Sequence, residues 1–133
     1  MTAENGRLNS SEEMKCGDEA LAEARHLAAG GFFRGAVSRA YYAAYHWARA
    51  LLVARGMESK THRGTIQLLN LHFVKDGHLG ESTAADLAHL ETYRELSDYT
   101  ATASFTEDEA RAEIARAERF VAACRRLAGS LNP

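Results

Sequence analysis

Four residues in the stretch from Ser38 to Leu52 carry side chains that bind phosphate, stack on a base or transfer a proton. Their spacing of three, four and three positions places them on one ridge of a helix: Arg39, Tyr42, His46 and Arg49. Arginine binds phosphate through paired N–H groups, and histidine exchanges protons near neutral pH. Because RNA carries its own nucleophile, the ribose 2′-hydroxyl, the ridge indicates metal-independent cleavage of RNA, with Arg39 and His46 as the catalytic pair.

Two more groups of residues suit such a site. The segment 60–63 is rich in cationic side chains and lies at the expected start of a helix, where free backbone N–H groups attract anions. Arg94 and Asp98 are four positions apart and can form an ion pair, with Tyr99 beside them. The residues predicted to bind RNA or a nucleotide are therefore Tyr42, Arg49, Lys60, His62, Arg63, Arg94, Asp98 and Tyr99.

The charge of the chain is unevenly distributed. The formal net charge is −2, yet the segment 34–63 contains six basic residues and one acidic residue. A local positive field suits an anionic partner such as RNA or a nucleotide. Two other interpretations stay open: acidic neighbours in space can balance the field, and the tyrosine- and arginine-rich ridge can be the seam of a purely structural helical dimer.

The elements that must position these residues are helices. The 133 residues suit one domain, proline occurs only once, and apolar residues recur at steps of three and four. We expect helices over residues 10–29, 33–55, 61–74, 81–99 and 106–127. Short connections between them predict an all-α, four- to five-helix up-and-down bundle over residues 10–129, with a loose segment at 1–9 and a tail at 130–133.

Capping patterns predict where three of these helices begin. Ser10 with Glu13 and Thr106 with Glu109 have the spacing of capping boxes, and Thr61 can cap a third helix. Within the second helix, one apolar face is expected to form the core: Val37, Tyr41, Ala44, Ala48, Leu51 and Leu52.

The sequence also limits the compartment and the ligands. No apolar run approaches the roughly 20 residues that cross a bilayer, and the N-terminal residues do not resemble a signal peptide. The two cysteines and six histidines show no metal-site spacing, so we expect reduced thiols, no metal and no cofactor. The expected location is the cytoplasm, with no membrane partner.

Three segments resemble the HEPN family of helical nucleotide-binding domains, and in particular its small stand-alone prokaryotic branch. Residues 38–46, SRAYYAAYH, are similar to its tyrosine-rich helix. Residues 60–64, KTHRG, are similar to its Lys-x-His-x-Gly segment, and residues 93–99, YRELSDY, to its Arg-x-x-x-Asp-Tyr motif. The resemblance extends over about residues 12–127, with the segments in the family's order.

The resemblance implies a four- or five-helix bundle that is usually a homodimer. Many members are ribonucleases with an Arg-x4-6-His motif, and the six residues between Arg39 and His46 match that spacing. Others act with a minimal nucleotidyltransferase in toxin–antitoxin pairs. Because Arg94 is followed at the fifth position by Tyr99 instead of histidine, an alternative is a non-catalytic module that binds nucleotides or recruits substrate for such a partner, with Tyr99 accepting a nucleotide group.

Overall fold

The computed structural model of the chain describes residues 3–131. These residues form five α-helices and one short π-helical segment, without any strand. The α-helices are α1 (Ala3–Ala29), α2 (Phe33–Ala54), α3 (His62–Leu69), α4 (Glu81–Tyr99) and α5 (Glu107–Leu131). The π-helical segment, η1 (Asn70–Val74), continues α3 directly. The predicted all-α class is confirmed.

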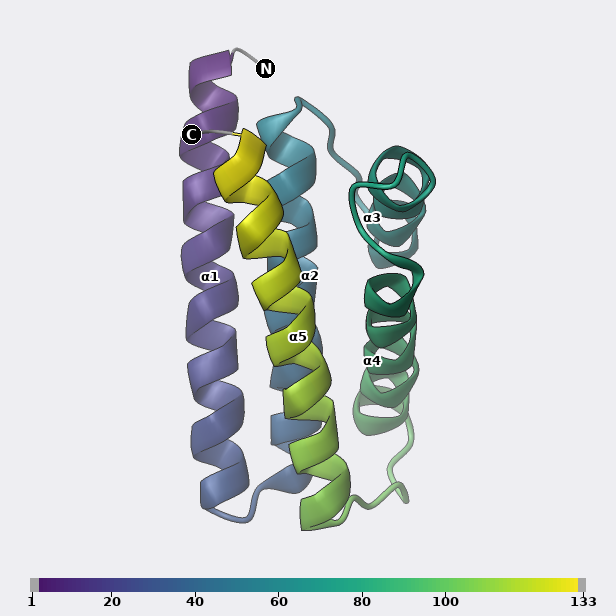
Figure 1. Cartoon of the computed structure of the whole chain (residues 1–133). Helices are drawn as coiled ribbons and strands as arrows, with labels where there is room; N and C mark the ends of the chain where they lie inside the picture. Colours follow the sequence, from purple (N-terminus) through teal and green to yellow (C-terminus); the bar gives the residue numbers. More distant parts are fainter. Residues whose placement is uncertain (1–2, 132–133) are drawn as a thin grey trace.

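The helices pack as an up-and-down bundle around α2 (Figure 1). Helices α1 and α2 run antiparallel, α5 packs against both of them, and α3 and α4 lie along the other side of α2. The start of α1 and the end of α5 lie at one end of the bundle, and the α1–α2 and α4–α5 connections lie at the other. Helix α2 is therefore in contact with every other α-helix.

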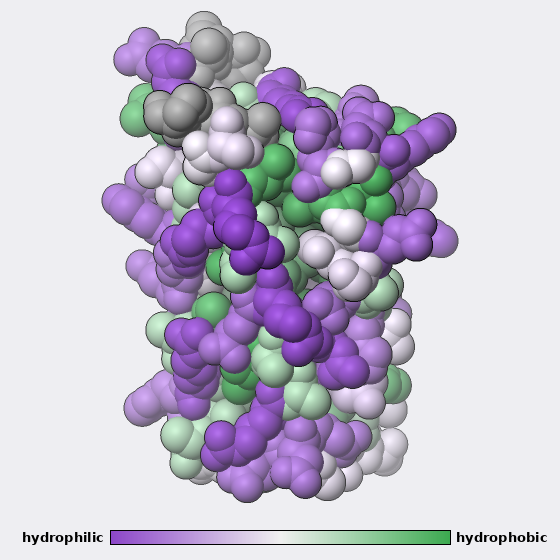
Figure 2. All heavy atoms as spheres, in the orientation of Figure 1, coloured by the Kyte–Doolittle hydropathy of each residue, from purple (hydrophilic) through white to green (hydrophobic). Residues whose placement is uncertain are grey.

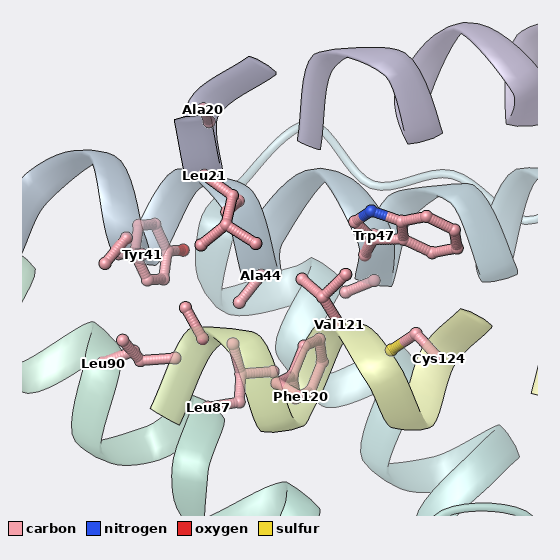
Figure 3. Close-up of a cluster of buried hydrophobic side chains, with 14 of the residues drawn as sticks. Ala20, Leu21, Tyr41, Ala44, Trp47, Leu87, Leu90, Phe120, Val121 and Cys124 are labelled. Carbon is pink, nitrogen blue, oxygen red and sulfur yellow. The ribbon is translucent and has the colours of Figure 1, made fainter. Parts of the chain in front are cut away.

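The core lies between the inner faces of α1, α2, α4 and α5 (Figure 3). Tyr41 and Trp47 of α2 belong to one buried cluster with Phe120 of α5 and with Leu87 and Leu90 of α4. All six α2 positions expected to form the core are at most 2% exposed: Val37, Tyr41, Ala44, Ala48, Leu51 and Leu52. The predicted inner face of α2 is thus confirmed.

A glycine allows α1 to approach α2 closely. A Cβ atom on Gly17 would lie 2.5 Å from Cδ1 of Trp47 and 3.1 Å from the carbonyl oxygen of Ala43, closer than van der Waals contact permits. The close approach brings the polar side chains along the edge of α1 within reach of those on α2. This contact decides the surroundings of the predicted site.

The predicted start of α1 is wrong. The helix begins at Ala3 instead of Ser10, and Ser10 makes no capping box with Glu13. Its hydroxyl instead donates a hydrogen bond of 2.8 Å to the carbonyl oxygen of Ala50 on α2, and Gly6 is also buried. Packing against the rest of the bundle therefore extends the helix through a segment whose sequence shows no amphipathic pattern.

The C-terminal end of the chain is also more helical than predicted, because α5 continues to Leu131, into the first half of the predicted tail. Residues 1–2 and 132–133 of the predicted terminal segments lie outside the described residues. The capping box of α5 is confirmed: the Thr106 amide donates to Oε1 of Glu109 over 3.0 Å, and the Glu109 amide donates to Oγ1 of Thr106 over 3.1 Å.

Arg34 of α2 holds the end of α4. Its guanidinium donates hydrogen bonds to the carbonyl oxygens of Ser97, Thr100, Ala101 and Ala103. The last turn of α4 contains no basic residue of its own, so this side chain supplies the cation that the carbonyl end of a helix favours. Arg34 therefore fixes the α4 terminus on which Asp98 and Tyr99 lie.

The surface drawn in Figure 2 is mostly hydrophilic, with apolar side chains gathered mainly beside the upper half of α5. Among residues 3–131, no helix is long and apolar enough to span a membrane.

Candidate nucleic-acid site

Three tyrosines of α2 surround the first residue of α3. The ring centroid of His62 lies 4.3 Å from that of Tyr45, 5.6 Å from that of Tyr41 and 5.8 Å from that of Tyr42. Thr61 positions this histidine, because its hydroxyl oxygen accepts a hydrogen bond of 2.9 Å from the Gly64 amide and caps α3. The cap predicted from the sequence is confirmed, and it brings His62 against the three tyrosines of α2.

A hydrogen bond connects His62 to the core. The hydroxyl of Tyr41, which is fully buried, lies 2.8 Å from Nδ1 of His62. Burial raises the pKa of Tyr41 well above its ordinary value, and the carboxylate of Glu91 raises it further, so Tyr41 stays a neutral phenol. Burial, followed by the positive charge of Arg94, lowers the pKa of His62. His62 is therefore a neutral imidazole near pH 7, with its Nδ1 side fixed.

Arg94 lies under this cluster and is only 5% exposed. Its Cζ atom is 4.9 Å from the ring centroid of Tyr41, and its Nη2 donates a hydrogen bond of 3.0 Å to Oε1 of Glu91. The ion pair expected between Arg94 and Asp98 is present, with Nη1 and Oδ2 3.7 Å apart. The buried Nε of Arg94 and Oε2 of Glu91 have no hydrogen-bond partner among residues 3–131.

The basic ridge of α2 is paired with carboxylates of α1. Nη2 of Arg39 donates to Oε1 of Glu23 over 3.0 Å. Nδ1 of His46 lies 2.7 Å from Oε2 of Glu13, and Nε of Arg49 donates to Oε1 of the same carboxylate over 3.0 Å. For these three residues, acidic neighbours in space do balance the basic segment, which is one of the alternatives that the sequence left open.

Glu13 is the link between these cations. Burial acts to raise the pKa of Glu13, but the hydrogen bonds from His46 and Arg49 outweigh it and hold the pKa below its ordinary value. Its side chain is 20% exposed and that of His46 is 26% exposed. Since Glu13 occupies Nδ1 of His46, the other ring nitrogen, Nε2, is the one left for a ligand.

Arg39 and His46 share one neighbour instead of touching each other. Cζ of Arg39 lies 5.3 Å from the ring centroid of Tyr42, and the ring centroid of His46 lies 6.5 Å from the same ring. Tyr45 likewise lies beside both histidines, with its ring centroid 5.7 Å from His46 and 4.3 Å from His62. We call Tyr42, Tyr45, His46 and His62 the tyrosine–histidine surface.

The remaining predicted residues lie around this surface. Lys60 and Arg63 are exposed, and no hydrogen bond or ion pair with another described residue occupies their side chains. Tyr99, at the end of α4, is 77% exposed, and Cζ of Arg94 lies 5.7 Å from its ring centroid. A cavity of about 430 Å³ lies beside Tyr45 and is lined by Tyr45, Arg49, Glu58, Ser59 and Lys60.

The sequence interpretation missed the acidic members of this site. Glu13 was assigned to a helix cap, and the predicted site included neither Glu23 nor Glu91. A signal for Glu91 exists, because it lies three positions before Arg94 on one helix face. Glu13 and Glu23 have no such signal, since their partners on α2 lie 33 and 16 residues away.

The chain matches a known protein family over most of its length. A model of the HEPN domain matches residues 11–127, which include every residue of the tyrosine–histidine surface. The chain belongs to the HEPN family. The resemblance seen in the three sequence segments is thereby confirmed.

Relatives of this HEPN protein come from archaea and bacteria. A Methanocaldococcus jannaschii protein named "Putative toxin" is 38% identical over 104 residues, which are 78% of this chain and 77% of the relative. A UPF0332 protein of Gloeobacter violaceus is 37% identical over 105 residues, which are 78% of this chain and 83% of the relative.

A solved structure shares the fold. A crystal structure of a Thermus thermophilus protein matches 89% of this chain and 97% of its own, with a TM-score of 0.77 and 19% sequence identity. At this identity the match supports the helical architecture alone.

Proposed function

We propose that this HEPN protein acts as a toxin-type RNA-binding protein that cleaves RNA without a metal ion. The observation that carries the proposal is the pair of histidines on the tyrosine–histidine surface. Each has its Nδ1 held by a protein group, Tyr41 for His62 and Glu13 for His46. Each therefore has Nε2 as the nitrogen for proton transfer, and the rings of Tyr42 and Tyr45 lie beside both.

The two histidines suit opposite roles in transesterification of RNA. His62, whose pKa is lowered, acts as the base in the tautomer whose Nδ1–H donates to the oxygen of Tyr41. Its unprotonated Nε2 accepts the proton of a ribose 2′-hydroxyl, and the 2′-oxygen attacks the adjacent phosphorus. His46, which forms an ion pair with Glu13 when it is protonated, donates its Nε2 proton to the leaving 5′-oxygen. The products are a 2′,3′-cyclic phosphate and a 5′-hydroxyl. The two histidines differ in their environments, as the acid and the base of one reaction require.

Other groups of the surface fit the binding of a single strand. The partly exposed rings of Tyr42 and Tyr45 can stack with bases. Arg39 at the Tyr42 end and Lys60 at the Tyr45 end supply positive charge for phosphates. Arg49 and Arg94 hold the surface in place through Glu13 and Glu91, and Arg63 adds a cation that faces solvent. The toxin name of one relative is consistent with an activity of this kind.

The test is cleavage of a labelled mixed-sequence RNA by the purified protein in EDTA. We expect 2′,3′-cyclic phosphate ends, and a loss of about a hundredfold or more in rate for His62→Ala and for His46→Ala. His72→Ala, which changes a histidine of η1 outside the surface, is the matched control. Cleavage that requires a divalent cation, or that survives in both surface variants, would reject the mechanism.

A second candidate function follows from Tyr99. Its phenol is 77% exposed and has Arg94 beside its ring, an arrangement that suits a nucleotide acceptor. In this function the protein is the non-catalytic partner of a minimal nucleotidyltransferase. The phenol oxygen would attack the α-phosphate of a nucleoside triphosphate and release pyrophosphate. A mass increase of one nucleotide that Tyr99→Phe abolishes supports it, and modification at another residue rejects it.

We also infer a homodimer through α4. Leu96 and Tyr99 are 41% and 77% exposed and lie three positions apart on this helix. Light scattering should give twice the monomer mass, and Leu96→Glu should give the monomer. A dimer that neither binds nor cleaves RNA would favour the purely structural alternative.

A further inference from the structure

The cavity beside Tyr45 combines groups that recognise a nucleobase. Its volume of about 430 Å³ falls in the range of small-molecule sites. Tyr45 provides an aromatic wall, Lys60 provides an ammonium group without a partner among the described residues, and Glu58 provides a carboxylate. Since the ring of Tyr45 also contacts His62, the cavity adjoins the tyrosine–histidine surface.

Arg49, one of the residues that line the cavity, is held in place by other side chains and by the backbone. Arg49 is 19% exposed, its Nε is fixed by Glu13, and its Nη1 donates to the carbonyl oxygen of Ser59 over 3.1 Å. Glu58 is less constrained. Its Oε1 is 3.5 Å from Nη2 of Arg49, its Oε2 has no hydrogen-bond partner among the described residues, and its side chain is 60% exposed. The carboxylate is therefore kept near the cavity but remains free to accept hydrogen bonds.

We propose that this cavity is a guanine subsite in which Glu58 reads the base and Tyr45 stacks on it. A carboxylate offers two acceptors side by side. Guanine is the base whose Watson–Crick edge offers two adjacent donors, N1–H and the 2-amino group, whereas the corresponding edges of adenine, cytosine and uracil each carry a single donor group. Lys60, which lines the same cavity, supplies the cation for the phosphate of the bound nucleotide. The subsite rests on the proposed RNA-binding function and names the base that the surface prefers.

The test compares uncleavable 2′-fluoro heptamers of uridine that carry a single guanosine, inosine, adenosine or cytidine at the centre, with binding measured by fluorescence anisotropy. We expect the guanosine heptamer to bind about tenfold more tightly than the others. Inosine should lose most of this advantage because it lacks the 2-amino group. Glu58→Gln should abolish the preference, since an amide offers only one acceptor. Glu19→Gln, which removes an exposed carboxylate of α1, is the matched control.

The outcomes separate this subsite from the proposed function. Equal binding of all four heptamers by the unchanged protein overturns the guanine subsite and leaves RNA binding standing. A guanosine preference that persists in Glu58→Gln also overturns it, because the base would be read elsewhere. Absence of binding to every heptamer overturns both. Because Glu58 is largely exposed, the variant is expected to fold normally, which circular dichroism verifies.

Discussion

The hydroxyl of Tyr41 lies 2.8 Å from Nδ1 of His62, which connects a fully buried residue of α2 to the first residue of α3. The phenol ring also packs against Arg94, whose Cζ is 4.9 Å from the ring centroid. Since a core tyrosine has one orientation, the bond transfers that orientation to a histidine at the surface. The proposed base of the site is thus positioned from inside the bundle.

Tyr41→Phe removes this bond while keeping the ring. We expect the free energy of unfolding to fall by about 1 kcal/mol, because one hydrogen bond is lost, and RNA cleavage to fall by a larger factor, because His62 loses its fixed orientation. Urea unfolding and initial cleavage rates measure the two effects. Tyr99→Phe removes an exposed hydroxyl and is the control for stability. Unchanged cleavage in Tyr41→Phe would show that the bond is only structural.

The pH dependence of cleavage should reflect the environment of His62. Burial and Arg94 lower its pKa from the ordinary value of 6.5, and only the neutral ring accepts a proton. The rate constant kcat/KM should therefore stay high as the pH falls to 6.5 and decrease only as the pH passes through the lowered pKa. A profile between pH 4.5 and 8 measures this limb. A midpoint at or above 6.5 would contradict the assignment of His62 as the base.

Glu13 should make the free energy of unfolding depend on pH in the acidic range. In the folded protein its pKa is held below the ordinary value of 4.5, because the hydrogen bonds from His46 and Arg49 outweigh burial. Its contribution is therefore present above pH 4.5 and is lost as the pH falls through the folded-state pKa. Glu13→Gln should lower the free energy of unfolding by about 2 kcal/mol at pH 7. On acidification the variant should lose less stability than the unchanged protein.

Urea unfolding of Glu13→Gln from pH 3 to pH 7 measures both effects, with Glu19→Gln as the control for a change of one charge on α1. If the two variants have the same pH dependence, the contacts of Glu13 with α2 do not contribute to folding.

The closeness of α1 and α2 can be tested at Gly17. Gly17→Ala places a Cβ 2.5 Å from Cδ1 of Trp47, so we expect a loss of about 1–3 kcal/mol of stability from overpacking. The fluorescence of Trp47, which is the only tryptophan, reports the transition directly. Gly129→Ala is the matched control, because a Cβ there meets no atom within 4 Å and alanine favours a helix by about 1 kcal/mol. Equal effects at both positions would contradict the close contact.

Much of the fold could be predicted because it depends on local sequence patterns. The apolar positions of α2 recur with the helical period, and Thr61 and Thr106 carry cap signals that act within three residues. The start of α1 could not be predicted in this way. Ser10 and Glu13 match a capping box, but their side chains bond to α2, at partners 40 and 33 residues away.

By itself, the sequence determined the helical class, the buried face of α2 and the ridge that carries Arg39, Tyr42, His46 and Arg49, since each follows from helical periodicity. Only the tertiary structure decided what these residues contact. The approach of α1 at Gly17 brings Glu13 and Glu23 onto the ridge, and the return of the chain at Thr61 brings His62 among the tyrosines. Side-chain partners on separate helices depend on how those helices pack, and packing distances are not encoded in the spacing of residues along one helix.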